Sequence, residues 1–170
     1  MQTKACKLRI RMKTIILYSS KSGNTKKVAD SMASQVGCDA IRITSNSTPS
    51  TVDLNGYDLF FVGTGLFAGT PNEDLMRYLG NLNLKTTKTF ALFITWGGAP
   101  RTDKLALAKL RRLLESKGQK VLENYFACYG GWKGVLMKRD HPKAEEIEAA
   151  GEWAKKLMDD LEKSLNKKRT

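Results

Sequence analysis

Six consecutive residues near the N-terminus have the composition of a phosphate-binding loop. They follow a short apolar run, precede a helical pattern, and are Ser20, Lys21, Ser22, Gly23, Asn24 and Thr25. Small residues let the backbone fold tightly with amide N–H groups pointing inward, and a helix N-terminus behind them adds partial positive charge. A plain helix cap needs only one small polar residue, whereas five of these six positions hold residues of cap type. The pattern therefore favours phosphate binding, with the Ser20, Ser22 and Thr25 hydroxyls as further donors.

Other site chemistries find little support in the sequence. The loop matches neither G-x-x-x-x-G-K-[ST] nor G-x-G-x-x-G. The one histidine, His141, precedes Pro142 and an acidic helical turn, so we interpret it as a helix cap, which leaves no histidine for a Ser-His-Asp triad or a multi-histidine metal site. Cys6, Cys38 and Cys128 are odd in number, and their spacing fits neither a disulfide framework nor a zinc site. We therefore expect no metal, assign no catalytic residue, and interpret Cys128 as buried filler.

The elements around the loop alternate between strands and helices. Short, nearly apolar runs predict buried strands at residues 13–19, 38–44, 58–64, 89–95 and 120–128. Helical stripes follow them at residues 28–36, 70–79, 105–118 and 147–165. The second helix is predicted to begin with Thr70 as its cap, Pro71 at its first position and Glu73 at its third. Nearly apolar strands that alternate with helices indicate an α/β protein whose parallel sheet is covered on both faces.

Length and composition indicate one domain. The chain has 170 residues, of which 41% are hydrophobic and 27% charged, and no apolar run approaches the roughly 20 residues that cross a bilayer. The domain is predicted at residues 12–165, between a basic extension at residues 1–11, disordered or not native, and a basic tail at residues 166–170. Without a secretory signal and with unpaired cysteines, we expect a reduced, cytoplasmic protein.

Function in a parallel sheet concentrates at the carboxyl ends of its strands, and four loops there carry a family resemblance. TIILYSSKSGNTKKVADSMA at residues 14–33 resembles the flavodoxin signature. FFVGTGLFAGTP, FITWGGAPR and FACYGGWKG follow in the order that this family shows, so the resemblance covers residues 12–161. It implies a flavodoxin-like three-layer sandwich with a five-stranded parallel sheet of order 2-1-3-4-5 and non-covalent binding of flavin mononucleotide (FMN).

The resemblance also implies which residues contact the cofactor. The loop at residues 20–25 would hold the phosphate. One side of the flavin ring would be lined by Thr64, Gly65, Leu66, Phe67, Ala68 and Gly69. The other side would be lined by Thr95, Trp96, Gly97, Gly98 and Arg101. Phe67 stands where the family often has a tryptophan, and a flat ring needs such aromatic walls. Tyr129, Gly130, Gly131 and Trp132 could cover the ring or shape a docking surface, and the sequence leaves both open.

The charge departs from that of the familiar, acidic electron-carrier flavodoxins. The net charge is +12, and residues 12–139 alone hold 18 basic and nine acidic side chains. We therefore expect redox partners with an acidic face. Candidate docking residues are Lys104, Lys109, Arg111, Arg112, Lys133, Lys138 and Arg139. A merely solvated basic surface is the alternative.

Three functions are consistent with these patterns. The first is an FMN electron carrier between protein partners. The second is an FMN-dependent oxidoreductase acting on a quinone- or porphyrinogen-like molecule, for which Gly97, Gly98, Gly130 and Gly131 could leave an open pocket. The third is a phosphate- or nucleic-acid-binding module without flavin, which ranks last because aromatic residues interleaved with basic ones are sparse outside the loops.

Overall fold

The computed structural model describes residues 11–97, 100–130 and 140–168. Its elements in chain order are β1 (Thr14–Ser19), α1 (Asn24–Val36), β2 (Asp39–Arg42), the 3₁₀ turns η1 (Pro49–Thr51) and η2 (Leu54–Gly56), β3 (Leu59–Phe67), β4 (Thr70–Pro71), α2 (Glu73–Gly80), β5 (Thr89–Trp96), α3 (Thr102–Ser116), β6 (Lys120–Tyr129) and α4 (Ala144–Lys167).

The five principal strands form one parallel sheet in the order β2-β1-β3-β5-β6. Counted as first to fifth along the chain, they have the predicted order 2-1-3-4-5, so the predicted fold is confirmed. A sixth strand, β4, was not predicted; its two residues pair antiparallel with the end of β3. Because all five principal strands run the same way, the loops that follow β1, β3, β5 and β6 reach the same edge of the sheet.

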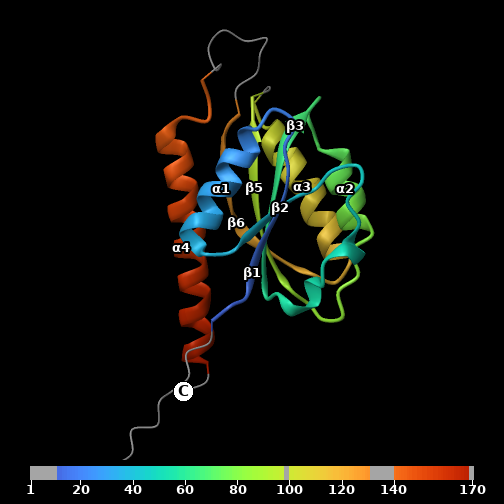
Figure 1. Ribbon diagram of the computed structural model, residues 1–170, viewed down its shortest axis with the longest axis vertical. Coiled ribbons are helices and arrows are strands. Elements are labelled where there is room, and N and C mark those ends of the chain that lie inside the picture. The colour runs from blue at the N-terminus through green and yellow to red at the C-terminus, as the bar shows by residue number, and fades with distance from the viewer. Residues whose placement is uncertain (1–10, 98–99, 131–139, 169–170) are drawn as a thin grey trace, which may run out of the picture.

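Helices cover the two faces of the sheet, with α2 and α3 on one side and α1 and α4 on the other (Figure 1). Successive side chains of a strand point to opposite faces. In β1, Ile15 and Leu17 therefore enter the core under α2 and α3, whereas Ile16 and Tyr18 enter the core under α1 and α4. This explains why the strand sequences are almost continuously apolar.

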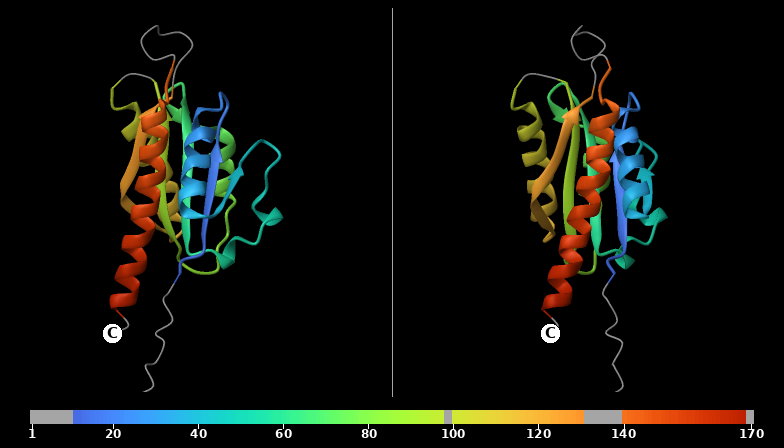
Figure 2. Two further views of the ribbon diagram at one scale, coloured as in Figure 1. Left: turned by 60° about the vertical axis from the view of Figure 1, so that its left-hand side comes forward. Right: turned by 90° about the vertical axis from the view of Figure 1, so that its left-hand side faces the viewer.

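Helix α4 lies close alongside α1 (Figure 2). A Cβ atom at Gly151 would lie 2.7 Å from Gln35 Cγ and 2.8 Å from Ser31 Oγ, so only glycine allows this approach. At the same crossing Ser31 Oγ donates a hydrogen bond of 2.7 Å to the Ile147 carbonyl. The contact fixes α1, the helix that begins at the predicted phosphate loop.

Helix α4 extends to Lys167, so the basic tail predicted from residue 166 begins inside α4.

The predicted start of the second helix is wrong. Thr70 and Pro71 form β4 and pair with Phe67 and Leu66, so the chain is still extended there. Helix α2 begins at Glu73, and its cap is Asn72. The side-chain oxygen of Asn72 accepts hydrogen bonds from the amides of Asp74 and Leu75.

Strand boundaries and burial also differ from the prediction in places. The ladder of β2 ends at Arg42, two residues early, while β3 continues three residues past Thr64. Helices cover both faces of the sheet as predicted, but the two edge strands are less buried than the others: β2 has no buried residue, and β6 has only Val121 and Cys128. The reason is their place at the edges of the sheet, where one flank and part of each face meet solvent.

Candidate functional site

The predicted phosphate loop joins β1 to α1. Gly23 is the N-cap of α1 and has φ +88°, a conformation that favours glycine. The buried Ser20 hydroxyl accepts hydrogen bonds from the amides of Gly23 (3.1 Å) and Lys26 (3.3 Å). Arg42 donates to the Ser20 carbonyl at 2.6 Å. Ser20 therefore shapes the loop from within.

The first turn of α1 offers donors that suit a phosphate. None of the hydrogen bonds formed among the described residues uses the N–H of Asn24 or Thr25. These amides belong to the N-terminus of a 13-residue helix, where unpaired donors and the helix dipole favour an anion. Lys21 and Ser22 lie exposed on the same loop. The donor set fits the phosphate of a mononucleotide.

The second predicted loop, residues 64–69, is mostly the end of a β-hairpin. β3 continues to Phe67, and Ala68 (φ 49°) and Gly69 (φ 75°) make a two-residue turn into β4. Positive φ at both positions is typical of the type I′ turn that suits strand twist. Lys21 Nζ lies 4.4 Å from the centre of the Phe67 ring, so this hairpin and the phosphate loop are neighbours.

The third predicted loop joins β5 to α3 and touches the first. Thr95 Oγ1 and Thr25 Oγ1 are 2.8 Å apart and share a hydrogen bond, and both residues are buried. A Cβ atom at Gly65 would lie 3.3 Å from Thr25 Oγ1, so the second loop reaches the same point. Arg101 is the N-cap of α3 with φ 72°. Of the predicted ring residues, Gly98 lies outside the described residues.

The end of β6 lies in the same cluster of loops. The sequence had left the role of this segment open. Gly130 donates its N–H to the Trp96 carbonyl at 2.7 Å and accepts from the Asn24 side chain. A Cβ atom at Gly130 would lie 3.0 Å from Thr95 Cβ, so glycine suits the close packing against β5 here. The rings of Tyr129 and Trp96 are 5.0 Å apart at an interplanar angle of 38°. Gly131 and Trp132, together with Lys133, Lys138 and Arg139, lie outside the described residues.

His141 is not the helix cap that the sequence suggested. Lys143 is the N-cap of α4, and its amide donates to Glu146 Oε2 at 2.8 Å. His141 Nδ1 lies 2.6 Å from the same oxygen, and its ring meets the edge of Tyr129 with centroids 5.6 Å apart. Glu146 therefore links the start of α4 to the aromatic pair at the site. His141 and Glu146 are close in sequence, but Tyr129 precedes Glu146 by 17 residues, and no local pattern signals that these two meet.

Two titratable groups beside this link have shifted pKa values. Burial acts to raise the pKa of Glu146, but hydrogen bonds from Lys143, His141 and Tyr129 and the His141 charge together lower it. Burial, with a smaller contribution from the Glu146 charge, raises the pKa of the Cys128 thiol to about 12. Cys128 is buried, as predicted, and stays protonated and unreactive at neutral pH.

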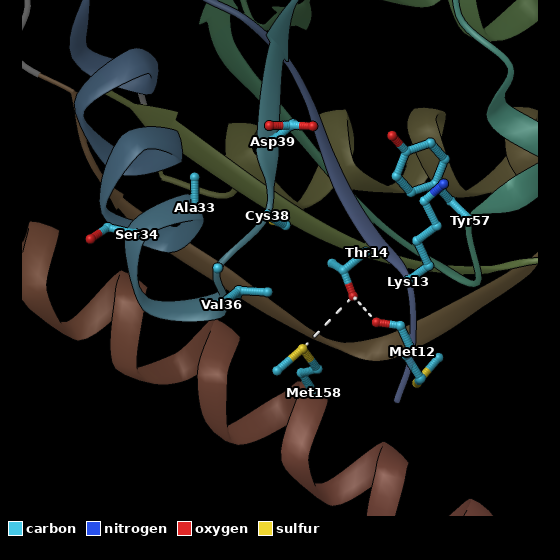
Figure 3. Close-up of a pocket in the computed structure, with 11 residues that line it drawn as sticks. Met12, Lys13, Thr14, Ala33, Ser34, Val36, Cys38, Asp39, Tyr57 and Met158 are labelled. Atoms are coloured by element: carbon cyan, nitrogen blue, oxygen red, sulfur yellow. Dashed lines mark hydrogen bonds between the residues drawn. The ribbon is translucent and has the colours of Figure 1, made fainter. Parts of the chain in front are cut away.

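A separate pocket of about 560 Å³ lies at the opposite edge of the sheet, near the amino ends of β1 and β2 (Figure 3). Thr14, Cys38 and Met158 are among its lining residues, and Thr14 Oγ1 donates to the Met12 carbonyl and toward Met158 Sδ. It contains none of the predicted site residues.

Within the described ranges, no three His, Cys, Asp or Glu side chains are grouped as a metal site. No helix in that part of the chain is long and apolar enough to span a membrane.

Comparison with known proteins agrees with this arrangement. A family model for the flavodoxin domain matches residues 15–139. The chain belongs to the flavodoxin family. It is 32% identical over 154 residues to an uncharacterised protein of Methanocaldococcus jannaschii, covering 86% of this chain and 99% of that protein. It is 30% identical over 175 residues to the flavodoxin-like domain-containing protein BilS of Clostridioides difficile, covering 86% and 97%.

Similarity to solved structures extends the comparison of the fold. The flavodoxin, WrbA-like protein from Agrobacterium tumefaciens superposes with a TM-score of 0.66 at 15% identity, covering 90% of this chain and 98% of that one. At that identity the likeness concerns the fold alone. Membership of the flavodoxin family makes this protein a flavin-binding redox protein.

Proposed function

We propose that this flavodoxin binds FMN without a covalent bond and carries electrons between protein partners. The observation that supports it best is the hydrogen bond between Thr25 and Thr95, which brings the first and third strand-end loops together at one edge of the sheet. Gly65 reaches the same point from the second loop. Three loops that the resemblance predicts to contact one cofactor are therefore neighbours.

The residues divide into phosphate-binding and ring-binding groups. The Asn24 and Thr25 amides would hold the phosphate at the N-terminus of α1, with Lys21 and Ser22 beside them. Phe67 and Trp96 would provide aromatic walls and exclude water from the ring. When bound, FMN supplies one- and two-electron chemistry, so the protein itself needs no catalytic side chain.

We prefer a carrier to an oxidoreductase for one structural reason. The oxidoreductase alternative used glycines, among them Gly130, to leave room for a small substrate. Gly130 instead packs closely against β5, where a Cβ atom would lie 3.0 Å from Thr95 Cβ, so its small size already has a packing role. The basic excess of residues 12–139 favours protein partners with an acidic face.

We also propose a cytoplasmic location, with which the free thiols of Cys38 and Cys128 are consistent.

The first experiment is to identify the bound cofactor. We expect a yellow preparation that releases FMN on heating at one molecule per chain. It should also reduce no soluble quinone with NAD(P)H unless a reductase is added. A colourless protein that takes up no FMN would overturn the proposal, and turnover without a reductase would replace the carrier by an oxidoreductase.

The second experiment tests the phosphate loop. Ser22→Ala removes a hydroxyl that lies exposed on the loop, and it should weaken FMN more than riboflavin, which lacks the phosphate. Loss of one hydrogen bond to a charged group costs about 1.5–3 kcal/mol, or roughly ten- to a hundredfold in affinity. Thr86→Ala, at an exposed position on the opposite edge of the sheet, is the matched control and should change neither affinity. An equal loss for both ligands would contradict a role in phosphate binding.

A further inference from the structure

The outward face of α3 combines basic side chains with an exposed leucine. Arg101, Lys104, Lys109 and Arg112 are all exposed, and Leu105 retains 64% of its accessible surface. Among the described residues the other exposed large apolar side chains reach only 37% and 38%. Leu105 is therefore the apolar side chain with the most surface left to bury.

These residues share one side of the helix. Arg101, Leu105 and Lys109 follow each other at intervals of four, and Arg112 lies three residues beyond Lys109, a spacing that places all of them on one face. The opposite face of α3 is buried against the sheet in the core shared with α2. Leu105 therefore lies in a stripe of basic side chains along the helix. We call Arg101, Leu105, Lys109 and Arg112 the α3 face.

The charges of the α3 face are not neutralised within the described protein. None of its three basic side chains forms an ion pair with a described acidic residue. Arg111 differs, because it pairs with Glu115 and Glu123 and donates to two carbonyls of β6. The structure thus removes Arg111 from the predicted docking residues.

The α3 face also lies beside the proposed flavin site. Arg101, the N-cap of α3, is the last residue of the predicted third flavin loop, and Leu105 is one turn further along the helix. In Figure 2 the helix lies at the outside of the molecule on the β6 side of the sheet. A partner that covers Leu105 would meet the carboxyl edge of the sheet.

We propose that the α3 face docks an acidic redox protein, whose carboxylates surround an apolar patch that covers Leu105. The proposal rests on the proposed electron-carrier function, and it names the surface through which electrons enter or leave. Complementary charge speeds encounter, whereas a buried apolar centre with a polar rim holds the complex. A nucleic acid would match the charges but offer phosphates to Leu105, so the leucine favours a protein partner.

The test uses the full-length protein and two defined probes, the soluble haem domain of an acidic b-type cytochrome and a basic c-type cytochrome. Binding is measured by calorimetry, which needs no flavin, and electron transfer from the reduced protein by stopped flow. The variants are Leu105→Ala and the double reversal Lys109→Glu/Arg112→Glu. The matched control is Lys85→Glu/Lys120→Glu, which makes the same charge change at exposed positions on the amino edge of the sheet.

At 0.01 M salt we expect the acidic cytochrome to bind more tightly than the basic one. The α3 reversal should weaken it by about tenfold or more, and the control reversal by about twofold or less. Leu105→Ala should weaken it about fivefold or more, as truncation of a central interface residue does. Raising the salt to 0.1 M shortens the Debye length from about 30 to about 10 Å. This should reduce the effect of the reversal but leave that of Leu105→Ala.

Four results would overturn the docking proposal. They are no binding of the acidic cytochrome at low salt, equal losses from the two reversals, no effect of Leu105→Ala, and tighter binding of duplex DNA that depends on Lys109 and Arg112 but not on Leu105. The proposed function fails in a different way. If binding follows the expected pattern but the protein holds no flavin or transfers no electron, the α3 face stands and the carrier does not. If transfer proceeds at a rate that no α3 variant alters, the carrier stands and the α3 face does not.

Discussion

Replacing the hydroxyls of Thr25 and Thr95 tests whether one buried hydrogen bond couples the first and third loops. The two oxygens are 2.8 Å apart, and the residues retain only 2% and 4% of their accessible surface. In either single variant, Thr25→Val or Thr95→Val, the remaining hydroxyl loses its partner away from water. An unsatisfied buried polar group costs about 1–3 kcal/mol. For a chain of this length, that lowers the melting temperature by roughly 2–12 °C.

The double variant should be more stable than the sum of the two losses allows. When both partners become apolar groups of the same shape, the net change in stability is close to zero. We therefore expect a coupling free energy of about 2–6 kcal/mol, the sum of the two single losses, in the double-mutant cycle. Urea unfolding of the flavin-free protein measures it without a contribution from ligand binding. Thr86→Val, at an exposed position, is the control and should stay within about 0.5 kcal/mol of the parent. Additive losses in the double variant would refute the coupling.

Three further predictions concern packing, pH and thiol reactivity. Gly63→Ala should destabilise the protein by about 1–3 kcal/mol or more, because its Cβ atom would lie 1.9 Å from Phe93 Cζ; an unchanged urea midpoint would contradict the packing. The pKa of Glu146 is lower than 4.5 in the folded protein, so its ionised form adds stability above that pH and the addition is lost as the pH falls through the folded value. The stability difference between the parent and Glu146→Gln should therefore shrink between about pH 6 and pH 3 in urea titrations, and a constant difference would argue against the shift. Burial, with a smaller contribution from a neighbouring carboxylate, raises the pKa of the Cys38 thiol to about 11 from 9.0; in a Cys6→Ser background, alkylation of native protein at pH 8 should be about a hundredfold slower than for an unperturbed thiol, and labelling at the unfolded rate would rule this out.

The strands and the loop at residues 20–25 could be predicted because both have local signals. Buried parallel strands are apolar on both faces, so each strand stands out as a short hydrophobic run. A loop such as residues 20–25 is recognisable because small polar residues and a glycine are concentrated between a strand and a helix. The resemblance to flavodoxins then implied the order of the strands, which local patterns alone do not contain.

The second loop shows where local signals mislead. Thr70, Pro71 and Glu73 have the composition of a helix start, yet Thr70 and Pro71 are held by pairing with β3. Asn72 also suits a cap, and the choice between Thr70 and Asn72 depends on a hairpin whose turn lies at Ala68 and Gly69. Tertiary pairing of this kind overrides a two-residue capping preference.

The sequence by itself determined most of the elements, their α/β alternation and the loop rich in small polar residues, because these properties depend on residues close together in the chain. Only the tertiary structure decided which distant groups meet. It joined Thr25 to Thr95, Asn24 to Gly130, and Tyr129 to Glu146. It also separated the paired Arg111 from the unpaired α3 face. Contacts across 70 or more residues depend on the order and register of the strands, and no single segment of the sequence encodes them.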